Sequence, residues 1–221
     1  MLAGLAALSV RQAAFGVFLV VLLASVPFGG MRAASAPKVT VLKKDKAITA
    51  APFKLEYKGA WQTDDIGDLS ATPKLKDGSH YLIVAALVST KAESSVPYST
   101  LREAIRLVGV HGLTRQGAFD PRVVKDSRTS NPDSILVDGD FHTMGDLPPR
   151  LTYGLYWVWV LKPGHPVPAK LTVMLQSTTY RKSSLDETMG YFDPVEEARG
   201  TFPVDVWETL QTSKVDVAGD G

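Results

Sequence analysis

The sequence predicts an all-β chain, an antiparallel β-sandwich that follows an N-terminal transmembrane or signal helix. The first supporting observation is an uncharged apolar run over residues 13–30, directly after Arg11. The second is a series of six to eight short apolar or alternating segments, separated by Gly, Pro and Asp, over residues 52–207. Such a series, with almost no helical pattern, is typical of two packed antiparallel sheets.

Residues 1–36 are expected to form a signal-anchor or transmembrane segment with its apolar core at 13–30. That core of 18 residues lies at the lower end of the roughly 17–25 residues that span a bilayer as a helix. Ala34-Ser35-Ala36 has the small residues of a cleavage site, but it lies several residues beyond the core and Pro37 follows it. We therefore favour an uncleaved anchor, and secretion after cleavage is the alternative.

The charges beside the apolar run give opposing signals on orientation. Arg11 and the amino terminus precede the run, whereas Arg32, Lys38 and three lysines from residue 43 onward follow it. The positive-inside rule would keep the domain in the cytoplasm, but long domains cross with little regard to charge. A short tail before a signal-like core favours export. We predict a single-pass protein with its domain on the extracytoplasmic face.

The first half of the chain contains two clear strand patterns. Residues 37–51 are a linker or a first strand, since Val39 and Val41 are apolar among lysines. Residues 53–61 carry apolar side chains or glycine at alternate positions, which is the period of a half-buried strand. Residues 81–88 (YLIVAALV) are apolar throughout, which predicts a central strand with both faces covered.

The middle of the chain leaves two interpretations open. Thr100 and Glu103 have the spacing of a helix capping box, so the sequence LREAIRL favours one or two helical turns. Alternatively, a strand begins at Ile105 and runs into Val110. The long connection that follows is rich in turn residues, and only residues 135–137 have an extended pattern.

The last third predicts a strand pair and a final edge strand. Residues 151–161 and 171–179 are rich in β-branched and aromatic residues, and a proline-rich connection separates them. This pattern predicts an antiparallel pair. Residues 201–206 form a last strand, and Pro203 places it at a sheet edge. The apolar pattern ends after Trp207, so residues 208–221 are predicted to be a flexible tail.

Two stretches resemble the hallmarks of bacterial envelope domains with a telokin-like, immunoglobulin-type sandwich. These are DGSHYLIVAALVS at 77–89 and PPRLTYGLYWVWVLKPGHPVPAKLTVML at 148–175. The resemblance covers roughly residues 50–206, and its motifs are structural. It implies an immunoglobulin-like cell-surface module of largely unknown function, with no catalytic residues to carry over. The chain departs from that family in having no lipobox cysteine and a long 114–148 connection.

Composition excludes several function classes. The chain of 221 residues has no cysteine, which rules out disulfides, a thiol nucleophile and cysteine-based metal sites. Without Arg11 and Arg32, which flank the apolar run, 22 Lys and Arg face 23 Asp and Glu. A nearly neutral domain is not the basic surface that nucleic acid requires. No phosphate-binding glycine motif occurs, so we predict neither nucleic-acid nor nucleotide binding.

The candidate metal ligands are Asp138, Asp140 and His142, with Asp133 close by in sequence. In an extended segment the side chains at i, i+2 and i+4 share a face and could converge on a divalent ion. Asp and Gly are equally what a turn requires, and a single strand rarely supplies a whole site. We therefore predict no metal and no cofactor. A solvated loop likewise explains the acidic cluster of Asp64, Asp65 and Asp68.

No reaction centre is visible in the sequence. The four histidines are His80, His111, His142 and His165, and neither a G-x-S-x-G elbow nor an H-E-x-x-H helix accompanies them. Trp157 and Trp159 share one face of a strand; exposed, they would be a binding platform, and buried, a sandwich core. We favour the core for both, and for Trp61.

These observations predict a non-enzymatic, membrane-anchored module on the outside of the cell envelope. Its expected partner is another envelope protein, bound through a sheet edge or the 114–148 connection, since recognition on such folds is carried by loops and edges. The alternative is a secreted module for a small ligand or metal. A third hypothesis is a hydrolase that uses His142 and nearby acids.

Overall fold

A computed structural model describes residues 15, 38–66, 74–114, 129–139 and 141–207. The chain divides into two compact units, residues 1–37 and 38–221, and all of the described strands belong to the second. Apart from Phe15, the predicted anchor lies outside the described residues, as does the predicted tail. In the parts of the chain that are described, no helix has both the length and the apolar character needed to cross a bilayer.

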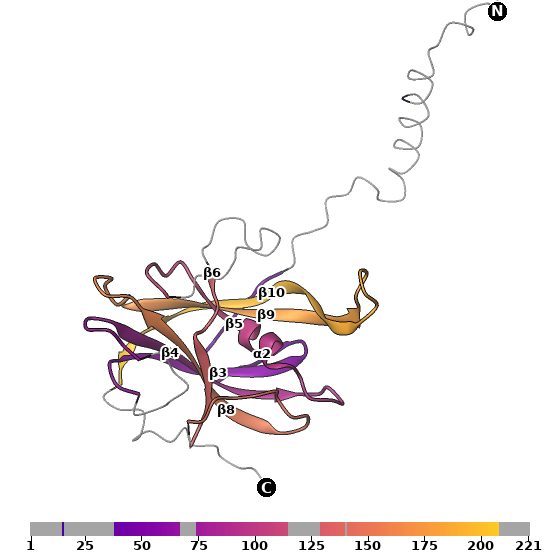
Figure 1. Cartoon of the computed structure of the whole chain (residues 1–221), viewed down its shortest axis with the longest axis horizontal. Helices are drawn as coiled ribbons and strands as arrows, with labels where there is room; N and C mark the ends of the chain where they lie inside the picture. Colours follow the sequence, from indigo (N-terminus) through magenta and orange to yellow (C-terminus); the bar gives the residue numbers. More distant parts are fainter. Residues whose placement is uncertain (1–14, 16–37, 67–73, 115–128, 140, 208–221) are drawn as a thin grey trace, which may run out of the picture. The chain divides into compact units, whose positions relative to one another are not determined.

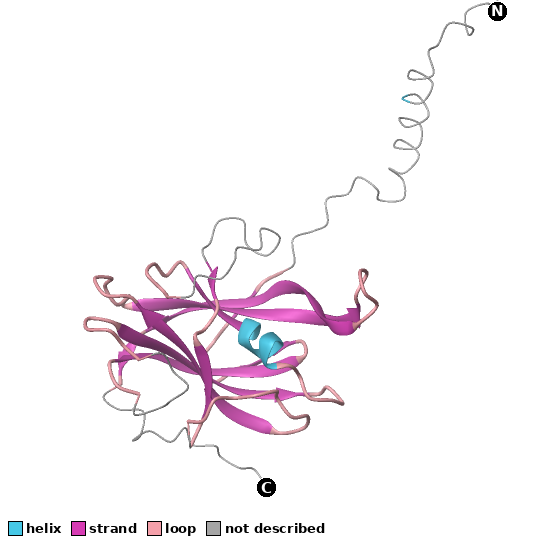
Figure 2. Ribbon diagram, in the orientation of Figure 1, coloured by secondary structure: helices cyan, strands magenta, loops and turns pink. Residues whose placement is uncertain are grey.

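The second unit consists of two β-sheets (Figure 1, Figure 2). The five-stranded sheet has the order β1 (Thr40–Val41), β10 (Met189–Pro203), β9 (Lys170–Lys182), β5 (Ile105–Val108) and β6 (Thr129–Ser130). The six-stranded sheet has the order β11 (Asp205–Val206), β3 (Phe53–Thr63), β4 (His80–Thr90), β8 (Thr152–Leu161) and β7 (Ser134–Val137), with β2 (Ala47–Ala50) also paired to β3. The predicted arrangement of two packed β-sheets is therefore confirmed.

Strand β4 lies inside the six-stranded sheet, as its continuous apolar run predicts. It pairs antiparallel with β3 on one side and with β8 on the other. Alternate side chains enter two separate apolar clusters, Leu82 and Val84 on one face and Tyr81 and Ile83 on the other. Because both faces of the strand are covered, neither shows the polar positions of a half-buried strand.

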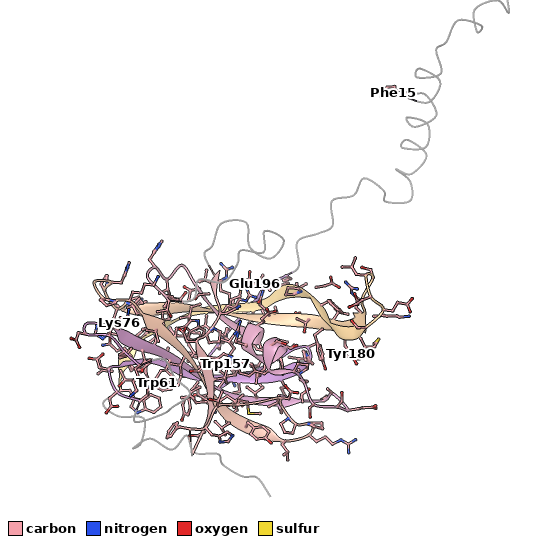
Figure 3. All side chains as sticks on the ribbon, in the orientation of Figure 1. Phe15, Trp61, Lys76, Trp157, Tyr180 and Glu196 are labelled. Carbon is pink, nitrogen blue, oxygen red and sulfur yellow. The ribbon has the colours of Figure 1, made fainter. Side chains whose placement is uncertain are left out.

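The main core lies between the two sheets and contains both tryptophans of β8. Trp157 and Trp159 are fully buried (Figure 3 labels Trp157). The indole N–H of Trp157 donates to the Leu101 carbonyl at 3.3 Å, and that of Trp159 donates to the Ser130 carbonyl at 3.1 Å. A buried indole N–H without a partner would be costly, so these bonds make the burial tolerable. The prediction that both are core residues is confirmed.

A second apolar cluster covers the outer face of the six-stranded sheet. Tyr156 and Trp207 are buried there, with their ring centroids 5.6 Å apart. Trp61, predicted to be a core residue, is only half-buried and packs against Trp207 at 4.9 Å. The backbone N–H of Trp207 donates to the Gln62 carbonyl at 2.8 Å. These contacts fix the end of the described domain onto the sheet.

The helix and the strand that the sequence left as alternatives both form, one after the other. Helix α2 (Tyr98–Ala104) leads directly into β5. The predicted capping box of Thr100 and Glu103 is wrong, because the helix starts earlier, after Pro97, and Pro97 has no side chain that can cap it. The Tyr98 N–H donates instead to Asp146 Oδ1 at 2.9 Å. The N–H at the start of the helix is therefore paired by a side chain from a distant loop, whereas the sequence predicted a partner within the helix itself.

The predicted pairing of residues 151–161 with 171–179 is wrong. β8 pairs with β4 and β7, whereas β9 pairs with β10 and β5 in the other sheet. The proline-rich connection between them therefore passes from one sheet to the other. Both strands have a face in the main core, and a period of two cannot distinguish neighbours in a sheet from strands that face each other across a core.

Strand β10 is much longer than the predicted strand at 201–206. It begins at Met189, and β9 extends to Lys182 to meet it. Its register shifts twice, between Phe192 and Val195 and between Glu196 and Ala198. Such bulges absorb extra residues and interrupt the side-chain alternation on which sequence patterns rely. The predicted strand at 201–206 is divided, since β10 ends at Pro203 and Asp205–Val206 form β11 in the other sheet. The predicted edge position is wrong for β10 as a whole, because β1 pairs with it on its outer side at Ala198 and Arg199.

A buried aspartate joins the start of β7 to the end of β8. The carboxylate of Asp133 accepts hydrogen bonds from the Thr114 hydroxyl at 2.8 and 3.0 Å and from the Val160 N–H at 2.8 Å. The Asp133 N–H donates to the Val158 carbonyl at 2.7 Å. The Asp133 side chain therefore holds the segment before β7 against β8 of the six-stranded sheet.

We expect Asp133→Ala to lower the free energy of unfolding by roughly 2–4 kcal/mol, because it leaves the buried Val160 N–H and the Thr114 hydroxyl without their acceptor. Asp146→Ala is the matched control, since it removes one exposed cap and should cost about 1 kcal/mol. Urea unfolding followed by tryptophan fluorescence measures both. Equal losses for the two variants would contradict the structural role of Asp133.

Candidate functional site

The β9–β10 hairpin extends beyond the five-stranded sheet as a two-stranded ribbon. β5 pairs with β9 only from Thr172 to Leu175, whereas β9 and β10 stay paired as far as Lys182 and Met189. Figure 1 shows this ribbon at the right-hand side of the view. We call residues 177–195 the arm. No residue of the arm belongs to the fully buried core, so the arm is an appendage of the sandwich.

A surface groove of about 870 Å³ lies at the base of the arm. We call it the arm-base groove. Three separate parts of the chain form its walls: the turn between β2 and β3, the loop over 91–94 and the arm residues Thr178, Tyr180 and Tyr191. The Thr178 N–H donates to the Ala51 carbonyl at 2.6 Å. This bond holds the arm against the β2–β3 turn, so that the two walls of the groove keep their spacing.

Two tyrosines form the aromatic wall of the groove. Tyr180 and Tyr191 are direct cross-strand partners, and their ring centroids lie 4.9 Å apart. Figure 3 shows Tyr180 on the arm, where it is 55 % exposed. Burial raises the pKa of the Tyr191 hydroxyl, and Tyr180 adds to the effect. The hydroxyl of Tyr191 therefore stays protonated at neutral pH and can donate a hydrogen bond to a ligand.

A second cross-strand cluster holds the arm in register. Arg181 Nε and Nη2 donate to the Asp193 carboxylate at 2.6 and 3.1 Å, and its guanidinium carbon lies 4.9 Å from the centroid of the Phe192 ring. The hydrogen bonds to Asp193 raise the pKa of Arg181 above its ordinary value. Successive side chains on a strand point to opposite faces, so this cluster braces the face of β9 opposite Tyr180.

The chemistry of the groove is that of a binding surface. Its apolar walls include Pro52 and Ala92, and its charged rim consists of Lys54, Lys91 and Glu93. Among the described lining residues Glu93 is the one carboxylate, and no histidine is present. Apolar and aromatic walls with a few polar groups at defined positions are what ligand sites in proteins offer.

The candidate metal ligands Asp138 and His142 do not lie on one extended segment. Asp138 and Gly139 form a turn, with a φ of 105° at the glycine. Asp138 Oδ1 accepts a hydrogen bond from the Tyr156 hydroxyl at 2.8 Å, and burial together with this carboxylate raises the pKa of Tyr156. His142 is exposed, and Asp140 lies outside the described residues. Within the described ranges no three His, Asp or Glu side chains are grouped for a metal. The candidate set as a whole is not tested, because it includes Asp140.

The acidic cluster after β3 is likewise described only in part. Asp64 Oδ1 lies 2.5 Å from His80 Nδ1, at the start of β4. The Thr63 hydroxyl donates to the Asp65 carbonyl at 2.9 Å. Asp68 lies outside the described residues. The two described aspartates, Asp64 and Asp65, therefore contact residues at the ends of β3 and β4 in the six-stranded sheet.

Sequence reasoning missed the arm-base groove. Its walls are about 40 and 90 residues apart in the sequence, and no local pattern predicts that they meet. The available signal was the β-branched and aromatic residues around the two tyrosines (Thr178, Thr179 and Phe192), which favour strand on both sides of the turn. The charged and turn-forming residues between the two tyrosines hide that signal.

Comparison with known proteins finds similarity in fold only. No protein-family model matches the chain, and no curated protein matches it. An uncharacterized β-sandwich protein from Clostridium difficile 630 is 9 % identical, with a TM-score of 0.42, over 77 % of this chain and 97 % of its own. A "putative lipoprotein" from Staphylococcus aureus is 12 % identical, with a TM-score of 0.40, over 78 % and 97 %. Similarities of this size say nothing about ligands or activity.

We expect Arg181→Ala to loosen the arm without unfolding the sandwich. The substitution removes both the Asp193 pair and the contact with Phe192, so hydrogen exchange of the arm amides should become about fivefold faster. The control is Lys182→Ala, which removes only the single contact with Glu187. Exchange rates that do not differ between the two variants would show that the Arg181 cluster does not hold the arm.

Proposed function

We propose that this protein is a non-enzymatic, membrane-anchored module on the outer face of the cell envelope. In this proposal an immunoglobulin-like sandwich presents the arm-base groove to a segment of another envelope polypeptide. The observation that carries the proposal is the groove itself, with its aromatic wall and its charged rim. The apolar run at 13–30, preceded by Arg11, supports the anchor.

The accessibility of the groove favours a polypeptide over a small molecule. Its volume of about 870 Å³ lies within the range of small-ligand sites, roughly 300–1,000 Å³. Such sites, however, bury most of their ligand, whereas seven of the twelve lining residues, among them Thr49, Lys54 and Lys91, are exposed. An open, tyrosine-lined groove suits a chain segment that enters and leaves it. Tyrosine is also among the residues enriched where proteins meet.

The test is site-specific photo-crosslinking of the full-length protein in its membrane. A photoreactive residue at Thr49, on the groove wall, should give a crosslink to one defined polypeptide. At Lys76 it should not, because Lys76 is exposed at the opposite end of the sandwich from Tyr180 (Figure 3). Identical crosslinked products from Thr49 and Lys76 would contradict the proposal.

The aromatic wall can be tested in the same assay. Tyr180→Ala combined with Tyr191→Ala should reduce the Thr49 crosslink at least about tenfold, since buried aromatic anchors carry much of the energy of an interface. Val206→Ala is the control, because Val206 is 70 % exposed and does not line the groove. An undiminished crosslink in the double variant would contradict a groove-bound partner.

The anchor is tested separately by mass spectrometry of the mature N-terminus. We expect a membrane-bound protein that retains residues 13–30, because Pro37 would be a poor first residue after cleavage. The membrane fraction and the culture medium are both examined. A product that starts near Pro37 in the medium would favour the secreted module in place of the anchored one.

A further inference from the structure

The tip of the arm holds an apolar side chain out in solvent. Leu185 is 96 % exposed, and Met189 behind it is 55 % exposed. The turn that carries Leu185 is well bonded: the Ser183 N–H donates to the Thr188 carbonyl at 2.7 Å, and Asp186 Oδ1 accepts from the Thr188 hydroxyl at 2.8 Å. Leu185 and Met189 together place apolar surface at the end of a hydrogen-bonded turn, where a second molecule has access to it.

We propose that the arm-base groove receives the arm tip of a second copy of this chain. The inference rests on the proposed function, in which the groove takes a polypeptide segment, and it names that polypeptide. Leu185 of one copy enters between the tyrosine wall and the β2–β3 turn of the other. The same contact is made in the opposite direction, so that two arms lie side by side and antiparallel.

The dimensions of the arm permit this exchange. Leu185 lies five positions beyond Tyr180, in the turn that follows Lys182, the last residue of β9. A strand rises about 3.3 Å per residue, so the stretch from Tyr180 to Lys182 spans roughly 7 Å, and the turn carries Leu185 farther from its own groove. A chain therefore has a groove at one end of the arm and the matching apolar residue at the other. A two-fold axis at the middle of the arm satisfies both sites at once and closes the assembly at a dimer.

The charges of the tip and of the groove are complementary. Residues 181–193 contain two basic and three acidic side chains. Arg181 pairs with Asp193 and Lys182 pairs with Glu187, so in the described part of the chain Asp186 is the acid of the tip without a basic partner. The groove rim has Lys54 and Lys91 against Glu93. The rim therefore carries the excess positive charge that an incoming Asp186 requires.

Pairing of two arms through the outer edge of β10 is disfavoured. The outer edge of β10 contains Pro194, which has no N–H to donate, and Asp193 beside it adopts a φ of 55° at the first bulge. Bulges and prolines of this kind prevent an edge strand from accepting another strand. Contact between two arms along the β10 edge must therefore depend on side chains, and Leu185 is the most exposed apolar side chain of the arm.

Disulfide trapping tests the arrangement directly, because the natural chain has no cysteine. Two differently tagged full-length chains, one with Leu185→Cys and one with Ser94→Cys on the groove wall, are produced together in membranes and oxidised. We expect a disulfide-linked product that contains both tags. The matched control replaces Ser94→Cys with Lys76→Cys and should give no such product. Absence of the first product, or equal yields of both, overturns the inference.

A charge at the tip provides the second measurement. Leu185→Asp should lower the yield of the two-chain product in the Thr49 photo-crosslinking assay about tenfold, since it places a carboxylate in an apolar site. Ser184→Asp adds the same charge one residue away and should leave the yield unchanged. A Thr49 crosslink that survives Leu185→Asp and joins a different polypeptide refutes the second copy but leaves the proposed function standing. No Thr49 crosslink at all refutes both.

Discussion

The fold depends on burying both faces of the β4–β8 pair. Ten residue pairs join the two strands, from His80–Leu161 to Ser89–Thr152. One face of the pair supplies Trp157 and Trp159 to the main core, and the other supplies Tyr156 to the second cluster. Full burial of a large apolar side chain is worth roughly 1.5–3 kcal/mol, so neither face can be left in water. The rest of the described domain is arranged around that requirement.

The five-stranded sheet meets this requirement with only part of its two longest strands. β9 reaches the main core with Leu171, Val173 and Leu175, and β10 reaches it with Ala198. Beyond these residues the two strands continue as the arm, in which only Tyr191 packs against the core. Ordering a backbone costs about 1–2 kcal/mol per residue, and in the arm little burial offsets that cost. Local contacts such as Arg181–Asp193 stabilise it instead.

Features that a segment determines by itself could be predicted from the sequence. β4 is apolar on both faces, so its place inside a sheet follows from its own residues, and the indole rings of β8 followed from the same alternation. The sheet neighbours of β8 and β9 could not be predicted, because the two strands face one core from opposite sheets. The cap on α2 comes from Asp146, 48 residues from Tyr98, and no local motif encodes it. The groove has the same origin, since its three walls meet only in the folded chain.

A bilayer anchor would lower the binding free energy that the groove itself must provide. An interface of standard size buries about 1,600 Å², and a groove that takes one turn of an arm contributes only part of that area. Confinement to a membrane raises the effective concentration of the partner, so a weak contact that would dissociate in solution can persist between tethered chains. The proposed anchor and the modest groove are therefore linked. Without the anchor, an exposed leucine and a tyrosine wall would have to overcome the full entropic cost of association.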